Sequence, residues 1–179
     1  MPLKITIPGE EFYNEKTETF STTDPVTITL EHSLVSVSKW EAKWHKPFLE
    51  PYPPKTEEEL LDYVRCMTIT QNVDPEIYNR LPLEAIEQIN KYIEDPMTAT
   101  TFKKKPAGPK TITTSEVIYY QMIALGVPFE CQKWHLSRLL TLLRVCNEKN
   151  NPKKMSKQDI YAQNRALNAA RRAALKTKG

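Results

Sequence analysis

The sequence predicts an α+β protein that is mostly α-helical, with a small antiparallel β element at the N-terminus, a helical bundle and a basic C-terminal helix. Residues 3–7 and 26–30 alternate apolar and polar side chains with the period of two typical of half-buried strands. Beyond residue 33, apolar residues recur every three or four positions, as on the buried face of a helix. The tail is rich in Ala, Arg and Gln, which favour helix, but its apolar face is thin.

These patterns divide the chain into three parts. They are a β-rich element at residues 1–33, a helical core at residues 34–150 and a basic helix or tail at residues 151–179. Within the core, residues 97–113 combine two prolines, a glycine and a Lys run, so we expect an exposed loop or linker there. Charge follows the same division. Residues 149–179 hold nine basic residues and one acidic residue, whereas residues 1–148 hold 16 basic and 21 acidic residues.

The β-rich element is expected to form a small antiparallel sheet or hairpin. Residues 26–30 place Val26, Ile28 and Leu30 on one face, directly after a turn signal at Asp24 and Pro25. We expect a third strand within residues 12–20.

Short helices are expected next. Residues 38–44 suit a helix with Trp40 and Trp44 on one stripe, and prolines then interrupt residues 47–54. Thr56 and Glu59 form a capping-box pattern at the start of a helix that reaches Met67. Asp74 and Pro75 begin another short helix. A helix over residues 83–93 would bury one face, made of Leu83, Ile86, Ile89, Asn90 and Ile93.

The last core helices are strongly apolar. Ser115 begins the first of them, and Gly126 stands at the position after its end where glycine is favoured. The second is expected over residues 131–146, and its core-facing residues include Trp134, Leu139 and Leu142. A final helix begins near Ser156.

Several classes of function lack their sequence signals. The four glycines all lie more than ten residues apart, so no phosphate-cradling loop is present. No apolar stretch reaches 18 residues, and the first residues do not resemble a secretory signal, so we expect no membrane contact. The three cysteines stand in apolar surroundings, which favours free thiols in a reducing compartment, the cytoplasm.

Metal binding and catalysis have weaker support than structural roles. Cys131 and His135 stand four residues apart, and Cys66 and Cys146 can complete a zinc site, but the usual paired spacing is absent. Buried thiols are the favoured interpretation. The candidate bases His32, His45 and His135 accompany no nucleophile motif. We therefore expect no catalytic residue, cofactor or metal, and no enzymatic activity.

Two sets of residues are candidates for partner binding. Trp40, Trp44 and Phe48 lie beside the proline-rich stretch, where an exposed aromatic groove can form. The alternative is that these side chains belong to the core. The second set is the basic residues of the tail, Lys153, Lys154, Lys157, Arg165, Arg171 and Arg172. They can contact nucleic acid, dock on an acidic protein, or remain solvated.

Four segments together resemble tailed-bacteriophage tail-module proteins, of the kind identified as tail assembly chaperones. They are SVSKWEAKWHKPFL at residues 36–49, EELLDYVRCMTI at residues 58–69, EVIYYQMIALGVPFECQKWHLSRLLTLLRVCN at residues 116–147 and NRALNAARRAALK at residues 164–176. The resemblance implies a non-enzymatic protein of the host cytoplasm that binds the tape-measure protein during tail morphogenesis. Such a chaperone prevents the partner's apolar helical repeats from aggregating before the tube assembles.

The alternative is a structural component of the virion, such as a neck, tail-completion or capsid-associated subunit. The β element would then add strands to a neighbouring subunit, and the basic tail would contact DNA or another subunit. Self-association is compatible with either function. Purified virions distinguish the two, because a chaperone is missing from them and a structural subunit is present.

Overall fold

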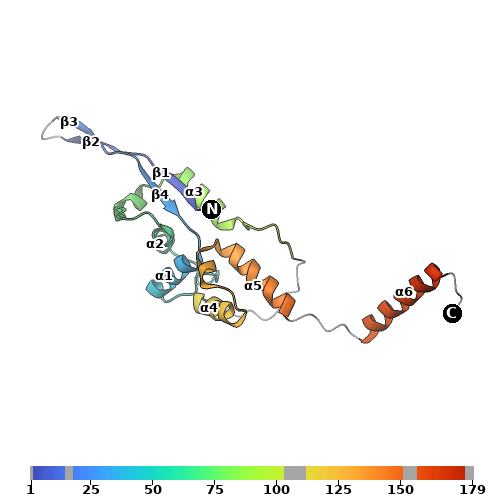
Figure 1. Ribbon diagram of the computed structural model, residues 1–179. Coiled ribbons are helices and arrows are strands. Elements are labelled where there is room, and N and C mark those ends of the chain that lie inside the picture. The colour runs from blue at the N-terminus through green and yellow to red at the C-terminus, as the bar shows by residue number, and fades with distance from the viewer. Residues whose placement is uncertain (1, 15–17, 103–111, 151–156, 176–179) are drawn as a thin grey trace. The chain divides into compact units, whose positions relative to one another are not determined.

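The computed structural model of the 179-residue chain describes residues 2–14, 18–102, 112–150 and 157–175. The elements are β1 (Leu3–Ile7), β2 (Glu11–Asn14), β3 (Thr19–Thr22), β4 (Val26–Leu30), α1 (Leu34–Trp44), α2 (Glu57–Met67), the 3-10 helix η1 (Pro75–Arg80), α3 (Leu83–Glu94), α4 (Ser115–Ala124), the 3-10 helix η2 (Phe129–Lys133), α5 (Leu136–Asn150) and α6 (Lys157–Leu175) (Figure 1). The expected fold class, mostly α with an N-terminal antiparallel β element, is confirmed. The chain forms two compact units, residues 1–144 and residues 145–179.

The four strands form one long, bent hairpin. β1 pairs antiparallel with β4, with Ile5 opposite Ile28, and β2 pairs antiparallel with β3, with Tyr13 opposite Phe20. Residues 12–20 were expected to hold one strand, but they contain the end of β2 and the start of β3, with Glu18 in the left-handed region (φ 49°) directly before β3. Figure 1 shows β2 and β3 extending beyond the helices of the first unit.

The bend of the hairpin depends on a glycine. A Cβ atom added to Gly9 would lie 1.7 Å from the carbonyl oxygen of Thr23, so only glycine allows the two arms of the hairpin to approach this closely. Next to this contact, the Thr23 amide donates to the Glu10 carbonyl at 2.9 Å and so joins the same two arms.

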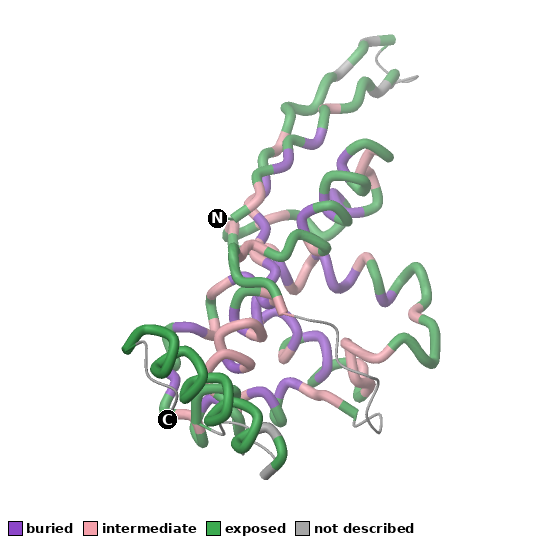
Figure 2. The backbone as a smooth tube through the Cα atoms, turned by 90° about the vertical axis from the view of Figure 1, so that its right-hand side faces the viewer, coloured by how far each residue is buried: buried purple, intermediate pink, exposed green. Residues whose placement is uncertain are grey.

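The core lies between one face of β1 and β4 and the surrounding helices. Ile5, Ile7, Ile28 and Leu30 point into it, as the alternating pattern predicts, and meet Leu34, Val37, Trp40, Met67, Ile89, Ile118, Met122, Leu136 and Leu139 among other buried residues. The chain after α2 continues the sheet, because the Ile69 amide donates to the Thr29 carbonyl at 2.9 Å. In Figure 2 these buried segments lie within the body of the first unit.

Local capping explains where the first helices begin and end. Ser33 accepts a hydrogen bond from the Ser36 amide, so α1 begins at Leu34, four residues earlier than expected. The Thr56 and Glu59 capping box at the start of α2 is confirmed, with both reciprocal hydrogen bonds present. The Asp74 side chain accepts from the Glu76 amide and caps η1, a 3-10 helix.

The buried face of α3 differs from the expected one. Ala85, Ile89 and Tyr92 are buried, whereas Leu83, Ile86 and Asn90 are exposed and Ile93 is half-buried. The physical reason is that α3 packs on β1, and the Tyr92 hydroxyl lies 3.4 Å from the His32 amide. This contact turns the helix so that Tyr92, rather than Leu83, faces the core.

The end of α4 matches the sequence prediction, but the start of α5 does not. Gly126 (φ 65°) follows α4, and the Val127 amide donates to the Met122 carbonyl at 2.8 Å, as in a Schellman motif. The helix expected over residues 131–146 instead begins at Leu136, after η2 and an extended Trp134. The cause is tertiary, because the Leu136 amide donates to the His32 carbonyl at 2.9 Å.

The remaining expectations concern connecting segments and the tail. Residues 97–102 and 112–114 form neither helix nor strand, as expected, and the rest of the 97–113 loop lies outside the described residues. α6 begins at Lys157, close to the expected Ser156. Among the described residues, none of the helices has the length and apolar character needed to cross a bilayer.

Candidate protein-binding site

The prediction of an exposed aromatic groove at Trp40, Trp44 and Phe48 is wrong for Trp40, whose side chain is 0% exposed. Its indole Nε1 donates to the Glu59 carbonyl at 2.7 Å. Trp44 and Phe48 are half-buried, and the Phe48 ring stacks on Tyr63 with centroids 3.9 Å apart. The proline-rich segment folds back over α1, so these rings form an internal cluster instead of an open groove.

Carboxylates on α2 hold this cluster in place. The Glu59 carboxylate pairs with Lys46 and accepts from the Thr56 amide, and these bonds lower the Glu59 pKa, with the Lys46 bond as the larger cause. The Asp62 carboxylate accepts from Lys43 at 2.6 Å and from the Trp44 indole at 2.9 Å. The donors to Asp62 join α1 to α2, whereas those to Glu59 come from the segment after α1 and from the N-cap of α2. Both carboxylates are thus satisfied within the fold, which is a structural role.

A third buried carboxylate, Glu41, fixes the position of α4. One oxygen accepts from the Phe48 amide at 2.8 Å, and the other accepts from the Ser115 amide at 2.7 Å. Ser115 is the first residue of α4 and is itself buried. Because a carboxylate compensates the positive end of the helix dipole, Glu41 anchors the N-terminus of α4 against α1.

The anchored helix is apolar on both sides. Ser115, Ile118 and Met122 are buried against the core. On the opposite side Val117, Tyr120 and Ile123 are exposed at 38%, 69% and 64%. We call these three residues the α4 apolar surface. Phe129 is exposed beside it, 6.4 Å from the half-buried ring of Tyr119 between centroids.

The α4 apolar surface is the best candidate site for a protein partner. Its residues recur at spacings of three, which gives one continuous stripe along a rigidly held helix. A contiguous exposed apolar stripe is typical of a surface that another apolar segment covers. Sequence reasoning assigned this helix to the core. The available signal was that its apolar residues surround the helix on all sides.

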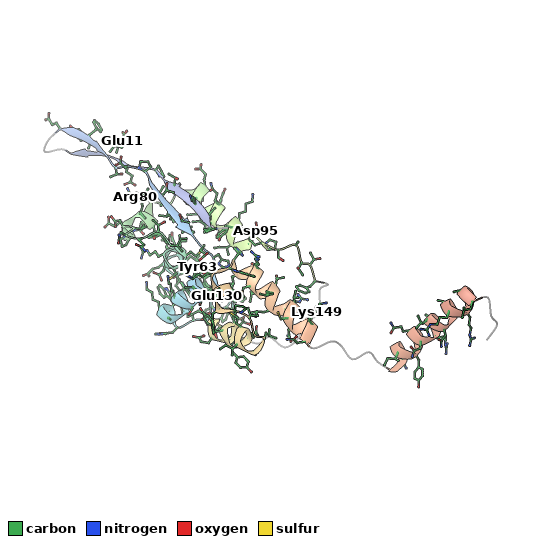
Figure 3. The ribbon with its side chains drawn as sticks, viewed as in Figure 1. Glu11, Tyr63, Arg80, Asp95, Glu130 and Lys149 are labelled. Atoms are coloured by element: carbon green, nitrogen blue, oxygen red, sulfur yellow. The ribbon has the colours of Figure 1, made fainter. Side chains whose placement is uncertain are left out.

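Histidines form a second cluster, in the interior. His32 and His135 are 4% and 6% exposed. The Nδ1 atom of His32 lies 2.5 Å from the Tyr63 hydroxyl, and the protonated Nε2 of His135 donates to the Tyr92 carbonyl at 2.9 Å. Figure 3 shows Tyr63 within the helical part of the first unit, whereas Glu11 lies on the projecting hairpin.

Burial dominates the titration of this cluster. Desolvation, with a smaller contribution from the nearby His135, lowers the pKa of His32 to about 4. Desolvation also lowers the pKa of His135, although the bond to the Tyr92 carbonyl opposes the shift. Burial raises the pKa of Tyr63. Both imidazoles are therefore neutral at physiological pH.

The weaker alternative, a zinc site with Cys131 and His135 on one helix face, lacks the helix that it requires. Cys131 belongs to η2 and His135 precedes α5, so the two residues are not on one helix. Within the described residues, no three His, Cys, Asp or Glu side chains are gathered to hold a metal ion. A cavity of about 180 Å³ beside His135 is also lined by Glu31, whose pKa is raised by burial, but Cys131 is not among its lining residues.

The basic residues of the tail are placed in part. Lys153 and Lys154 lie outside the described residues, and Lys157 begins α6, although its side chain is not described. Arg165, Arg171 and Arg172 are exposed on α6. In Figure 2 residues 160–175 of this helix are coloured as exposed.

Comparisons with protein-family models, with curated proteins and with solved structures each find no match to this chain.

Proposed function

We propose that this protein is a non-enzymatic tail assembly chaperone of a tailed bacteriophage, which binds the tape-measure protein in the host cytoplasm during tail morphogenesis. The observation that carries the proposal is the α4 apolar surface, where Val117, Tyr120 and Ile123 stand exposed on a helix whose other side is locked into the core. The sequence resemblance described above supplies the identity of the partner.

The physical fit lies in what an assembly chaperone must do. A tape-measure chain with apolar helical repeats needs its apolar stripes covered before the tube forms around it. The α4 apolar surface offers a matching stripe with helical spacing, so a client helix can pack along it. Tyr120 contributes a large, rigid contact of the kind enriched in binding sites.

Co-expression with the cognate tape-measure protein tests the proposal. The wild-type chain is expected to make that partner soluble and to copurify with it. Tyr120→Ser with Ile123→Ser should abolish both effects, because serine removes the apolar contact from two exposed positions. The matched control is Leu83→Ser with Ile86→Ser, which changes two exposed apolar residues of α3. A tape-measure protein that stays insoluble with the wild-type chain, or equal loss in both double variants, contradicts the proposal.

A second candidate function is a structural component of the virion. The projecting hairpin favours it, because Tyr13 and Phe20 pair across β2 and β3 with ring centroids 4.9 Å apart and are both exposed. An exposed two-stranded element with aromatic side chains can add to a sheet of a neighbouring subunit. Mass spectrometry of purified virions separates the two functions. A structural subunit is present at stoichiometric levels, whereas a chaperone is missing.

A further inference from the structure

One face of α6 gathers hydrogen-bond donors. Tyr161, Asn164, Arg165, Asn168 and Arg172 line one shallow depression along the helix. Their spacings of three, four and seven residues place them on neighbouring turns of the same face. All five are exposed. We call these five residues the α6 polar stripe.

The α6 polar stripe is separate from the apolar face of the same helix. Ile160 and Leu167 stand seven residues apart, with Ala170 and Ala174 continuing their face. At 100° per residue, the two faces point more than about 90° apart around the helix axis. Residues 160–175 contain no Asp or Glu, so no carboxylate neutralises the arginines from within this segment. The stripe is therefore a cationic face distinct from the apolar face, and Arg171 lies outside the stripe, one turn after Leu167.

We propose that the α6 polar stripe binds duplex DNA through its backbone phosphates. Arg, Asn and Tyr side chains are among the groups that most often contact phosphate and sugar in protein–DNA complexes. The stripe runs for about 16 Å from Tyr161 to Arg172, and its arginines stand about 10 Å apart along the axis. That spacing suits contacts to phosphates of one duplex, which recur regularly along each strand.

The same features argue against other polyanions. Single strands are usually held by stacking on several aromatic rings, and Tyr161 is the one aromatic residue of residues 149–179. An α-helix fits the wide major groove of B-form DNA but not the deep, narrow major groove of A-form RNA. An acidic protein would need carboxylates repeated at the spacing of the stripe. The phosphates of a DNA strand recur at a regular spacing whatever the sequence.

Fluorescence anisotropy with the full-length protein and a labelled duplex of about 25 base pairs, long enough for two turns, tests the proposal. Binding should weaken steeply as salt rises, because phosphate contacts release counterions. Arg165→Ala with Arg172→Ala should weaken binding. The plot of the logarithm of the association constant against the logarithm of the salt concentration should become less steep by about 2, since each phosphate that a side chain neutralises contributes about 0.9 to its steepness. Alanine preserves helix propensity, so the helix is retained.

Three double variants serve as comparisons. Lys39→Ala with Lys91→Ala removes the same charge from exposed positions of the first unit and should leave DNA binding unchanged. Ile160→Ala with Leu167→Ala changes the apolar face and should also leave it unchanged. Asn164→Ala with Asn168→Ala removes donors without changing charge. It should weaken binding severalfold while the salt slope stays nearly constant.

Specific outcomes overturn the proposal. Equal weakening by the lysine and arginine double variants would show diffuse charge attraction rather than binding at the stripe. Single-stranded DNA or duplex RNA binding as tightly as duplex DNA would exclude a duplex-DNA site. Polyglutamate competing as well as DNA at equal charge would assign the stripe to an acidic protein. No binding of the wild-type protein to the duplex at low salt would remove the site altogether.

Discussion

The imidazole of His32 meets that of His135 edge-on, with ring centroids 5.0 Å apart and planes inclined by 65°. The two residues join β4 and α1 to the start of α5. The Leu136 amide donates to the His32 carbonyl, and Ser33 forms an antiparallel β-bridge with His135. Tyr63 and Tyr92 enclose the pair. Burial lowers the pKa of His135, and the charge of Asp95 opposes that shift only in part. A junction that joins sequence-distant elements thus depends on two neutral histidines.

This pair predicts a loss of stability in mild acid. The pKa of His32 is about 4 in the folded protein, whereas the ordinary value of 6.5 applies to the unfolded chain. Between these two pH values the unfolded chain therefore binds more protons than the folded protein. The contribution of His32 to the free energy of unfolding should therefore be constant above about pH 7 and fall as pH drops from 6.5 to 4, by on the order of 3 kcal/mol. The lowered pKa of His135 acts in the same direction.

Urea denaturation at a series of pH values measures this effect. His32→Asn keeps an acceptor near the position of Nδ1 but cannot titrate, so its stability should vary less between pH 7 and pH 4, from a lower starting value. His45→Gln is the control, because His45 is exposed. It should keep the wild-type dependence. An equal loss of stability in wild type and His32→Asn would contradict the assignment to His32.

Glu41 provides a second prediction, which concerns the anchoring of α4. Glu41→Ala leaves the part-buried amide of Phe48 and the buried amide of Ser115 without their acceptor, and the loss at a buried amide costs about 1–3 kcal/mol. The midpoint of urea denaturation should fall, and the corresponding free energy of unfolding should decrease by several kcal/mol. Glu41→Gln retains one acceptor oxygen, so its midpoint should lie between those of the wild type and Glu41→Ala. Glu87→Ala, at an exposed position of α3, should change the midpoint little. A neutral Glu41→Ala would show that α4 is held by its apolar side alone.

Local signals account for the part of the fold that sequence reasoning predicted. The alternation in residues 3–7 and 26–30 depends on a period of two that is independent of the rest of the chain. The Thr56–Glu59 capping box and Gly126 act within one turn of their helices. The errors occur where contacts over long sequence distances decide. Tyr92 turns α3 toward His32, and the same histidine's carbonyl fixes the first residue of α5.

The candidate site was harder to predict for the same reason. Prolines near Trp40 suggested exposure, yet the loop after α1 returns Phe48 to stack on Tyr63, and the indole of Trp40 reaches the Glu59 carbonyl. The apolar character of α4 suggested burial, yet among the described residues of the first unit, neighbouring elements cover one side of it and leave Val117, Tyr120 and Ile123 exposed. Amphipathic periodicity shows which residues can be buried. It does not show how many sides of an all-apolar helix find a partner.

The two tryptophans Trp40 and Trp134 should differ sharply in their contribution to stability. Trp40 is fully buried and loses both its packing and the bond to the Glu59 carbonyl on truncation, so Trp40→Ala should cost about 3–5 kcal/mol. Trp134 was expected in the core but is half-buried, with the Arg138 guanidinium 4.2 Å above its ring. Such an exposed cation–π contact contributes about 0.5–1 kcal/mol, so Trp134→Ala should cost clearly less than Trp40→Ala. Thermal unfolding followed by circular dichroism compares them directly. Equal shifts in Tm would place Trp134 in the core after all and contradict the half-buried position that separates it from Trp40.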